Sequence, residues 1–544
     1  MDTKALRQKI LDLAIRGKLV PQDPNDEPAE VLLERIREQK QQMLKEGKLK
    51  KKDIKNDTII FKGEDNLHYE KFQDGTVKCI EDEIPFEVPE GWVWERLSNL
   101  ASFSGGKTPS TSHSEYWDGD ILWVTSKDMK SKYITSSQLC LSALGAEQMR
   151  IHQPNTLLLV TRSGILRHTL PVAILKESAT INQDLKAIVL YMPQLAEYIY
   201  VCLKGMEARL LLKYTKSGTT VENVNFDDFQ KVLLPIPPAQ QIDRIISSTG
   251  DAECIVSTVE DNKVALADCV AKAKAKILDL AIHGKLVPQD PNDEPASVLL
   301  ERIRAEKEEL IKQGKIKRDK KESVIFKGDD NSYYLRTELE TMEIADELPY
   351  EIPESWEWAR IGNVFQVNPR NKLDDLLEVS FIPMPLIDDG FSGKHTSEVR
   401  VWKKIKSGFT HFTEGDIGIA KITPCFENRK SVVFRNLKNN YGAGTTELHV
   451  LRPYASSILP EYVLAYVKSS MFIDKGKQEF TGAVGQQRIG KDYVENSYFP
   501  IPPLAEQKRI VEQISTVYKQ LDLISNALRW EHPKVCVNLQ TDVR

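Results

Sequence analysis

The sequence carries an internal repeat that constrains its architecture more than any other feature. Residues 9–37 and 276–304, aligned at an offset of 267, differ only at Arg16/His283 and Glu30/Ser297. Agreement over so long a stretch indicates a duplicated structural unit. We therefore expect two copies of one frame, and we expect the fold to follow from how they pack.

The repeat continues beyond these stretches and then breaks. Similarity fades over residues 98–233 in the first copy and 362–498 in the second, so an almost invariant frame carries two different inserts. The tryptophans shared by both copies are expected to anchor the core. The further matching segments are Phe61–Asn66 with Phe326–Asn331, Glu83–Leu97 (with Trp92 and Trp94) with Glu347–Ile361 (with Trp356 and Trp358), and Pro235–Pro238 with Pro500–Pro503.

Apolar spacing predicts the helices of the frame. Leu6, Ile10 and Leu13 predict a helix over residues 3–16, which Gly17 ends. A second helix is expected over residues 29–46. From 239 to 283 a spacing of three and four residues continues for more than five heptads, which predicts one long helix of about 67 Å with Gly250 as its weak point. Its seam comprises Ile242, Ile245, Thr249, Ala252, Val256, Val259, Lys263, Leu266, Val270, Ala273, Ile277 and Leu280.

The two ends of the chain together repeat this long helix. Residues 504–530 match its first part, and the N-terminal helix matches its last part. We predict a circular arrangement in which two long helices pack antiparallel, one continuous and one assembled from both termini, with an insert at each end. Pro533 is expected to leave a loose tail. The C-terminal seam comprises Ile510, Ile514, Val517, Leu521 and Ile524.

Both inserts have mixed α/β (α+β) character. In the first, residues 121–124, 156–161 and 185–190 have strand composition, and 195–214 is expected to be a helix. The second has comparable pieces at 379–382, 416–420, 447–451 and 461–476. We predict that the inserts share a fold but differ in surface.

Composition limits the class of protein. No apolar run reaches the roughly 18 residues of a membrane span, and the polar start is unlike a signal peptide. Seven dispersed cysteines without a CxxC pair indicate a reducing cytoplasm and no structural zinc. The net charge is −5, but residues 98–238 hold 14 Lys and Arg against 12 Asp and Glu, and residues 359–503 hold 19 against 15. Both inserts are therefore mildly positive, which is compatible with a polyanionic partner.

This organisation resembles the specificity subunit of a type I restriction-modification system. The resemblance covers almost the whole chain. It rests on the duplicated frame, the divergent inserts and several short motifs. The first insert lacks the Lys421–Phe426 string of the second and has Thr161–Arg167 at the comparable place. The motifs are Ala239–Ile246, Leu504–Val511, Ser104–Ser110, Val160–Gly164, Gly415–Lys430 and Thr481–Ile489.

The resemblance implies a function without a catalytic centre in this chain. The inserts would be target-recognition domains that each read half of a split DNA sequence, and the helices would fix the gap between halves. Partners would be double-stranded DNA, modification subunits that methylate adenine with S-adenosylmethionine, and restriction subunits that use ATP and Mg²⁺. The expected regions are 1–83 (N-terminal frame), 84–238 (first recognition domain), 239–346 (central frame with the long helix), 347–503 (second recognition domain) and 504–544 (C-terminal helix and tail).

The candidate DNA-contacting residues are those in loops rich in donors and acceptors. Arg and Lys read guanine, Asn and Gln read adenine, and hydroxyls and further cations hold phosphates. Because the inserts differ, two unlike half-sites and a non-palindromic target are expected. The candidates are Lys107, Thr108, Arg162, Ser163, Thr219, Thr220, Arg370, Lys372, Lys421, Thr423, Asn428, Arg429, Lys430, Gln486, Gln487 and Arg488.

Other functions have less support. Residues 101–108 meet a relaxed phosphate-loop pattern, but Pro109 and a polar stretch follow where a helix is needed. Gly442–Glu447 lacks the third glycine of a dinucleotide motif, and the histidines show no ligand spacing. The remaining alternative is a duplicated coiled-coil scaffold whose two domains bind proteins rather than DNA.

Overall fold

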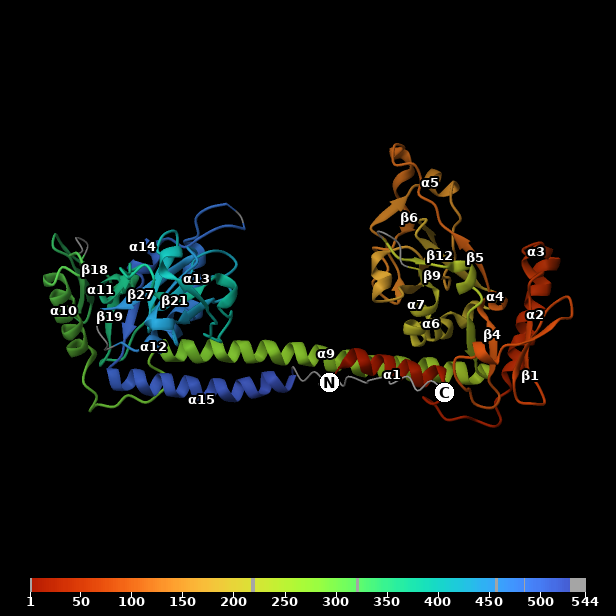
Figure 1. The fold of residues 1–544 in the computed structure, drawn as a ribbon, viewed down its shortest axis with the longest axis horizontal. Coiled ribbons are helices and arrows are strands. Elements are labelled where there is room, and N and C mark those ends of the chain that lie inside the picture. Colours follow the sequence, from red (N-terminus) through yellow and green to blue (C-terminus); the bar gives the residue numbers. More distant parts are fainter. Residues whose placement is uncertain (1, 217–220, 319–321, 455–457, 484, 529–544) are drawn as a thin grey trace. The chain divides into compact units, whose positions relative to one another are not determined.

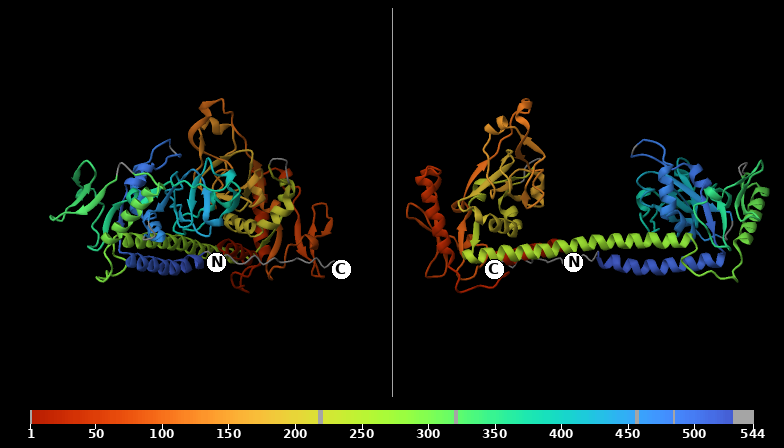
Figure 2. Two further views of the ribbon diagram at one scale, coloured as in Figure 1. Left: turned by 60° about the vertical axis from the view of Figure 1, so that its left-hand side comes forward. Right: turned by 180° about the vertical axis from the view of Figure 1, so that it is seen from behind.

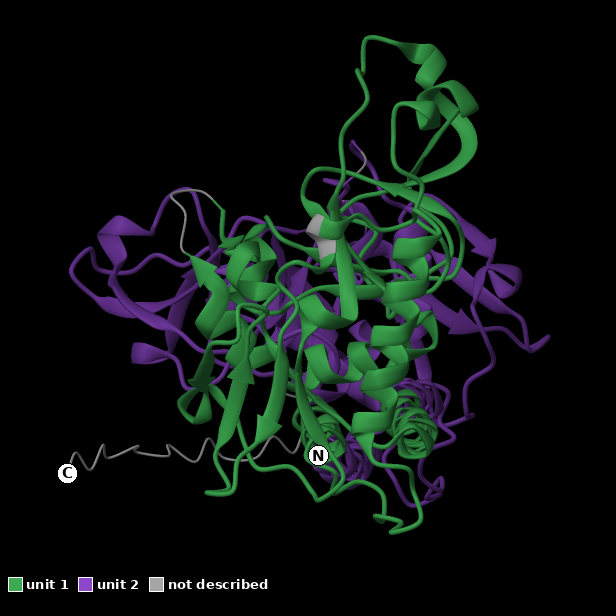
Figure 3. Ribbon diagram, turned by 90° about the vertical axis from the view of Figure 1, so that its right-hand side faces the viewer, with its two compact units in different colours: residues 1–262, 531–544 green, residues 263–530 purple. Residues whose placement is uncertain are grey.

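The computed structural model describes residues 2–216, 221–318, 322–454, 458–483 and 485–528. The chain divides into two compact units, residues 1–262 with 531–544 and residues 263–530 (Figure 3). Each unit holds one copy of the frame and one insert. The expected C-terminal tail lies outside the described residues.

The frame of each unit begins with helices and ends with a small sheet. In unit 1 it comprises α1 (Thr3–Ile15), α2 (Ala29–Lys45), α3 (Lys51–Ile54), the sheet β1 (Ile59–Lys62), β2 (His68–Lys71) and β3 (Val77–Cys79), and β4 (Val93–Arg96) paired with β15 (Leu233–Ile236). In unit 2 it comprises α10 (Ala296–Lys312), the sheet β16 (Val324–Lys327), β17 (Tyr333–Arg336) and β18 (Thr341–Glu343), and β19 (Glu357–Arg360) paired with β28 (Tyr498–Ile501).

A glycine ends the first helix of each copy for a steric reason. Gly17 and Gly284 have φ of +65° and +67°, a conformation that glycine adopts at little cost. A Cβ at Gly17 would lie 2.5 Å from the Pro89 side chain, and one at Gly284 would lie 2.4 Å from Pro353. The helix end therefore packs directly on the segment that leads into the insert.

A terminal helix runs antiparallel to α9 (Ala239–Ile282) in each unit, as predicted. In unit 1, Arg7 of α1 binds Glu253 at 2.8 Å and Glu260 at 2.7 Å, whereas Asp26, beyond the end of α1, binds Arg244. The contacted residues of α9 thus lie closer to its start as the chain passes from α1 to Asp26, so the two helices run antiparallel. Helix α9 continues through Gly250 without a break (Figure 1).

Unit 2 pairs its helices in the same way. Asp293, which follows α9, binds Arg509 near the start of α15 (Leu504–Leu528) at 2.7 Å, and Lys274 within α9 binds Asp522 at 2.5 Å. Helix α15 lies beside α9 in both views of Figure 2. The helix predicted from the two ends of the chain therefore exists as two separate helices, one in each unit.

The helical seam is not evenly buried. Ile245, Val256, Val270 and Ile510 are buried, whereas Leu266 and Ile524 are 42% and 43% exposed and depart from the expected seam. Ile242 is also buried. The other predicted seam residues are half-buried, namely Leu6, Ile10, Leu13, Thr249, Ala252, Val259, Lys263, Ala273, Ile277, Leu280, Ile514, Val517 and Leu521.

The two inserts share a strand topology. In unit 1 the main sheet has the order β5-β12-β9-β10-β7, and in unit 2 it has the order β20-β27-β24-β25. The first four strands of each sheet correspond in order and direction. A second sheet contains a parallel pair, β6 with β11 or β21 with β26. Both inserts are therefore versions of one α/β domain, as predicted.

The strands and helices of the inserts have the following bounds. Unit 1 contains α4 (Leu97–Leu100), β5 (Ala101–Gly105), β6 (Trp117–Val124), β7 (Tyr133–Ile134), β8 (Leu139–Leu141), α5 (Ala143–Glu147), β9 (Leu157–Val160), β10 (Val172–Leu175), β11 (Ala179–Ile181), β12 (Leu185–Leu190), α6 (Ala196–Gly205), α7 (Glu207–Tyr214), β13 (Thr215–Lys216), β14 (Asn223–Val224) and α8 (Phe226–Phe229). Unit 2 contains α11 (Ile361–Val364), β20 (Phe365–Val367), β21 (Glu378–Ile382), β22 (Glu398–Val401), β23 (Thr410–Thr413), β24 (Ile417–Ala420), β25 (Ser431–Val433), β26 (Tyr441–Gly444), β27 (Leu448–Pro453), α12 (Pro460–Val467), α13 (Ser470–Gln478) and α14 (Lys491–Asn496).

The shared tryptophans join each frame to the start of a long helix. The Trp92 indole N–H donates to Gln241 Oε1 at 2.9 Å in the first turn of α9. The Trp356 N–H donates to Glu506 Oε2 at 2.8 Å in the first turn of α15. Trp94 and Trp358 are each 1% exposed. These residues are core anchors common to both copies, as expected.

We call the place where β4 or β19 of the frame leads into the insert the joint of each unit. A buried carboxyl distinguishes the joint of unit 1 from that of unit 2. Glu95 accepts hydrogen bonds from Asn99 Nδ2 at 2.6 Å and from the Arg96 backbone N–H at 2.8 Å. Burial raises the pKa of Glu95 to about 7. The repeat places Ala359 at the same position in unit 2. Only unit 1 therefore has an ionisable group there.

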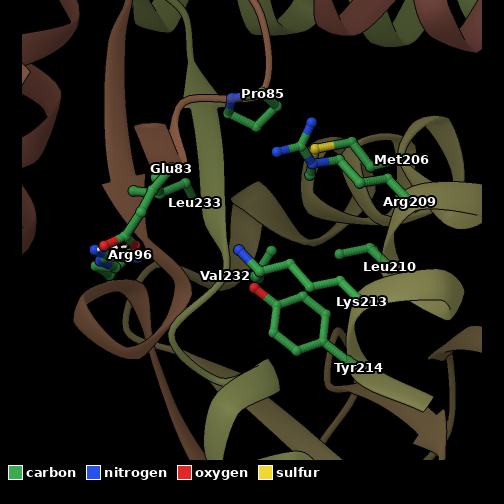
Figure 4. Close-up of a pocket in the computed structure, with 10 residues that line it drawn as sticks. All are labelled: Glu83, Pro85, Arg96, Met206, Arg209, Leu210, Lys213, Tyr214, Val232 and Leu233. Carbon is green, nitrogen blue, oxygen red and sulfur yellow. Dashed lines mark hydrogen bonds and ion pairs between the residues drawn. The ribbon is translucent and has the colours of Figure 1, made fainter. Parts of the chain in front are cut away.

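Next to this joint, α7 and the frame enclose a small cavity. Arg209 and Lys213 of α7 line it together with Glu83 and Arg96 (Figure 4). Its volume is about 20 Å³, and a cavity of that size holds roughly one water molecule. Arg96 is bound by Glu70 at 2.7 Å and by Glu83 at 2.9 Å. The cavity is therefore part of the joint rather than a ligand site.

The Glu95→Gln variant is expected to change how stability depends on pH. The folded pKa of Glu95 is about 7, above the usual 4.5. The stability that the protonated carboxyl allows is therefore fully present below pH 4.5 and is lost as the pH rises through 7. Glutamine stays neutral, so the variant should gain up to about 3 kcal/mol relative to the parent between pH 4.5 and 8. Thermal unfolding at both pH values measures this. Exposed Glu87→Gln is the control, and equal pH dependence of the three proteins would contradict the assignment.

Candidate nucleic-acid interface

In unit 1, the predicted contact loops emerge at one edge of the main sheet. Gly105 at the end of β5 lies opposite Lys186 near the start of β12, and Val160 at the end of β9 lies opposite Leu185. The loops that follow or precede these strand ends are 106–108, 161–163 and 182–184. Segments far apart in the sequence thus meet at this edge, which we name edge 1.

Backbone hydrogen bonds hold the segments of edge 1 together. The Thr161 N–H donates to Asp184 O at 2.8 Å, and the Ser163 N–H donates to Glu222 O at 3.2 Å. The Val224 N–H donates to Thr161 O at 2.9 Å, and the backbones of Arg162 and Asn223 form an isolated antiparallel β-bridge. Three segments therefore form one junction.

Unit 2 builds the same junction at the corresponding edge of its own sheet, where β24 ends opposite the start of β27. We name this edge 2. The Lys421 N–H donates to Glu447 O at 3.0 Å, and the Thr423 N–H donates to Gln487 O at 2.9 Å. The Ile489 N–H donates to Lys421 O at 3.0 Å, and Ile422 forms a bridge with Arg488. All four backbone links of edge 1 recur in edge 2.

The side chains at these matching backbone positions differ. Successive positions carry Thr161, Arg162, Ser163, Asp184, Glu222 and Asn223 at edge 1, and Lys421, Ile422, Thr423, Glu447, Gln487 and Arg488 at edge 2. Ser163 and Thr423 both carry a hydroxyl, and Asp184 and Glu447 both carry a carboxylate, but the other four pairs differ in chemical type. The two edges thus present different sets of donors and acceptors on one backbone frame. Such an arrangement can recognise two different polar surfaces with the same fold.

Ion pairs at both edges hold side chains in fixed orientations. At edge 2, Arg488 Nε lies 2.8 Å from Glu447 Oε2 and Nη2 lies 3.0 Å from Oε1. This contact is the main cause of the lowered pKa of Glu447 and of the raised pKa of Arg488. At edge 1, Arg167 binds buried Glu222 at 2.6 Å. Glu222 Oε2 is buried and has no partner among the described residues.

Three predicted contact residues donate hydrogen bonds to backbone carbonyls within unit 2. Arg370 Nη1 donates to Phe409 O at 2.8 Å, and Arg429 Nε donates to Lys468 O at 2.9 Å. Lys430 Nζ donates to Ile387 O at 2.9 Å. These cations help to hold neighbouring loops together, and their contact with DNA stays a prediction.

The other predicted residues lie in the loops at or next to the two edges. Lys107 and Arg162 are exposed, and the Thr108 hydroxyl donates to Gln183 Oε1. Thr219 and Thr220 lie outside the described residues. The remaining candidates are Ser163 at edge 1, and Lys372, Lys421, Thr423, Asn428, Gln486, Gln487 and Arg488 in unit 2, all exposed or half-buried.

The structure adds edge residues that the sequence reading missed. Gln183 and Asp184 precede β12, Thr445 and Glu447 precede β27, and Asn223 lies in β14. Gln183, Asp184, Thr445 and Glu447 lie just before β12 or β27, and these strands pair with β9 and β24, which end in the predicted loops. Sequence distance hides this relation, because sheet order alone reveals which strand ends meet.

Other sites receive no support from the geometry. No helix opens at Lys107 in the described loop after β5, as a phosphate loop would require, and Gly442–Gly444 belongs to strand β26. Among described residues, no cluster of three or more His, Cys, Asp or Glu side chains is placed to hold a metal ion. In the same part of the chain, no helix has the length and apolar content needed to cross a bilayer.

Comparison with known proteins gives a consistent family. The family model of the type I restriction modification DNA specificity domain matches twice, at residues 89–252 and 353–529. The specificity subunits of the type I restriction enzymes EcoAI and EcoEI from Escherichia coli are 46% identical over 254 residues and 47% identical over 247 residues. These matches cover 46% and 45% of this chain, and 40% and 39% of the relatives' own lengths.

A solved structure is also similar in part. The crystal structure of the HsdS subunit from Thermoanaerobacter tengcongensis aligns with a TM-score of 0.37 at 16% identity, over 82% of this chain and 94% of that chain. The family model, by contrast, matches one segment in each unit and more than half of the sequence in total. The chain therefore belongs to the family of type I restriction-modification DNA specificity proteins.

Proposed function

We propose that this chain is the DNA-recognition subunit of a type I restriction-modification enzyme. It would bind a split, non-palindromic target, with one half read by each insert, and would direct adenine-N6 methylation and restriction by partner subunits. The observation that carries the proposal is the junction built twice with the same backbone links and different side chains. A protein that reads two unlike half-sites needs this combination.

The chemistry of the two edges suits base reading in a major groove. Arginine and lysine pair with guanine, asparagine and glutamine pair with adenine, and carboxylates accept from cytosine. Edge 1 offers Arg162, Asp184 and Asn223, and edge 2 offers Lys421 and Gln487. Nearby cations such as Lys107 and Lys372 would contact phosphates, which position a protein without carrying sequence information. We propose these residues as the contact set.

The repeated frame supplies the rest of the proposed role. Regions 1–83, 239–346 and 504–544 would form the frame that docks the partners, and 84–238 and 347–503 would be the recognition domains. Half-site centres would lie roughly 10 bp apart, about one turn of DNA. Because the frame occurs twice, we expect two modification subunits, which use S-adenosylmethionine, besides restriction subunits that use ATP and Mg²⁺. The chain itself would be non-catalytic and would act in the cytoplasm.

Selection from a random-sequence DNA library tests this function. The complex of this chain with its modification subunits is expected to enrich one split motif, and binding to that duplex should weaken as salt rises, with a slope near −0.9 per phosphate contact. The Lys107→Ala/Lys372→Ala variant, which removes two proposed phosphate contacts, should flatten the slope by about 2. Lys9→Ala on α1 is the control. A scaffold that binds only proteins would enrich no motif and show no salt slope, and that result would overturn the proposal.

A further inference from the structure

The two inserts are attached to their helix pairs in different ways. In unit 1, α6 lies against α1, and Gln8 Nε2 donates to Gly205 O at 2.9 Å. A Cβ at Gly205 would lie 3.0 Å from the Ile15 side chain, so the two helices approach closely at this glycine. The first insert is therefore held by direct helix packing.

In unit 2, an aromatic contact reaches the middle of α15. The ring of Phe391, in the loop before β22, meets Tyr518 of α15 edge to face, with centroids 6.0 Å apart and planes at 83°. The Tyr518 hydroxyl donates to Lys274 O of α9 at 2.9 Å, and Lys274 Nζ lies 5.2 Å from the Tyr518 ring centroid. The contact thus links the insert to both helices.

The repeat shows that this position of the frame has been altered. At offsets of 267 and 265, Lys274 corresponds to Arg7 and Tyr518 corresponds to Glu253. In unit 1 those two residues form an ion pair at 2.8 Å. In unit 2 a lysine takes the place of Arg7, and a tyrosine that presents its ring to Phe391 takes the place of Glu253. The frame therefore differs between the copies at the point where the second insert touches it.

From Phe391 the contacts continue to edge 2. The Arg429 guanidinium lies 5.1 Å from the Phe391 ring centroid. Buried Lys468 donates to both Gly390 O at 2.6 Å and Arg429 O at 2.7 Å, and the Gly390 N–H donates to Asn428 O at 2.7 Å. The loop that carries Phe391 and the loop 421–430 of edge 2 are thus held together as one body.

We infer that Phe391 is a positioning residue that fixes edge 2 on the α9/α15 pair. It holds the recognition surface at a set orientation to the helices through Tyr518 on one side and Arg429 on the other. This inference rests on the proposed function and deepens it, because the orientation of a reading surface on its helices determines which gap between half-sites the protein accepts.

The Phe391→Ala variant tests this inference. The complex with the modification subunits is titrated with the selected duplex and with duplexes whose gap is one base pair longer or shorter. Loss of the edge-to-face and cation–π contacts is expected to reduce the preference for the native gap about tenfold. Affinity for the native duplex should fall much less. Tyr518→Leu removes the other ring and should give the same loss.

Three controls give each outcome a meaning. Phe391→Tyr keeps the ring and should restore the preference, and Tyr518→Phe, which loses only the hydroxyl, should stay close to the parent. Val399→Ala, at a residue 56% exposed on strand β22, should have no effect. If the parent binds no duplex, the proposed function fails. If the parent discriminates and both ring-deleting variants discriminate equally well, the positioning inference is overturned and the proposed function stands.

Discussion

The Val256→Asp variant is expected to separate α1 from α9. Val256 is 1% exposed and lies on the same face of α9 as Glu253 and Glu260, the residues that bind Arg7. Removing the buried valine costs about 2 kcal/mol, and burying a carboxylate without a partner adds at least as much. The total, about 4 kcal/mol or more, is comparable to the whole stability of many domains.

Hydrogen exchange of the peptide covering residues 2–15 measures this effect. In the parent, α1 should be protected, and in Val256→Asp that protection should be lost while the β-sheets of the insert stay protected. Ile255→Asp is the matched control, because Ile255 is the adjacent residue and is 66% exposed. Equal exchange in the two variants would mean that α1 does not depend on this seam.

Replacing Lys421, Thr423 and Gln487 together with alanine is expected to abolish reading of one half-site only. Each good contact to a base is worth about 1–3 kcal/mol of discrimination, so affinity for the selected duplex should fall at least about 100-fold. Base preferences in the other half should stay unchanged, because edge 1 has its own junction. Library selection repeated with the variant gives both readouts.

The control for that variant is Lys403→Ala/Lys404→Ala, which removes two exposed cations from the same insert. It should weaken binding slightly and equally for all sequences, because cations that touch only phosphates carry no base information. If the triple variant relaxed both half-sites to the same extent, the assignment of one half to each insert would be wrong.

The repeat explains why the frame could be predicted from the sequence. The same sequence occurs twice, so each helix could be recognised in two places. Helices α1 and α9 end within a residue or two of the expected positions. The helix expected over 195–214 was wrong in one respect, because it is interrupted at Met206, between α6, which ends at Gly205, and α7. Gly205 is the site of close packing on α1, a tertiary constraint that spacing within the segment does not reveal.

The candidate interface was less accessible to sequence reasoning. The loops around Arg162 and Lys421 were identified from their polar composition, but Asp184 and Asn223 join them only through sheet order. Residue type alone does not separate the two roles, because Arg429 and Lys430 also donate to internal carbonyls. A cation in a loop looks the same in sequence whether it binds a phosphate or its own backbone.

The most direct measurement is the mapping of methylated adenines in DNA from a host that expresses this chain with its modification subunits. Two unlike recognition edges on one chain predict a single split motif whose two halves differ, with one methylated adenine in each half. A palindromic motif, or the same base preferences in both halves, would contradict the account.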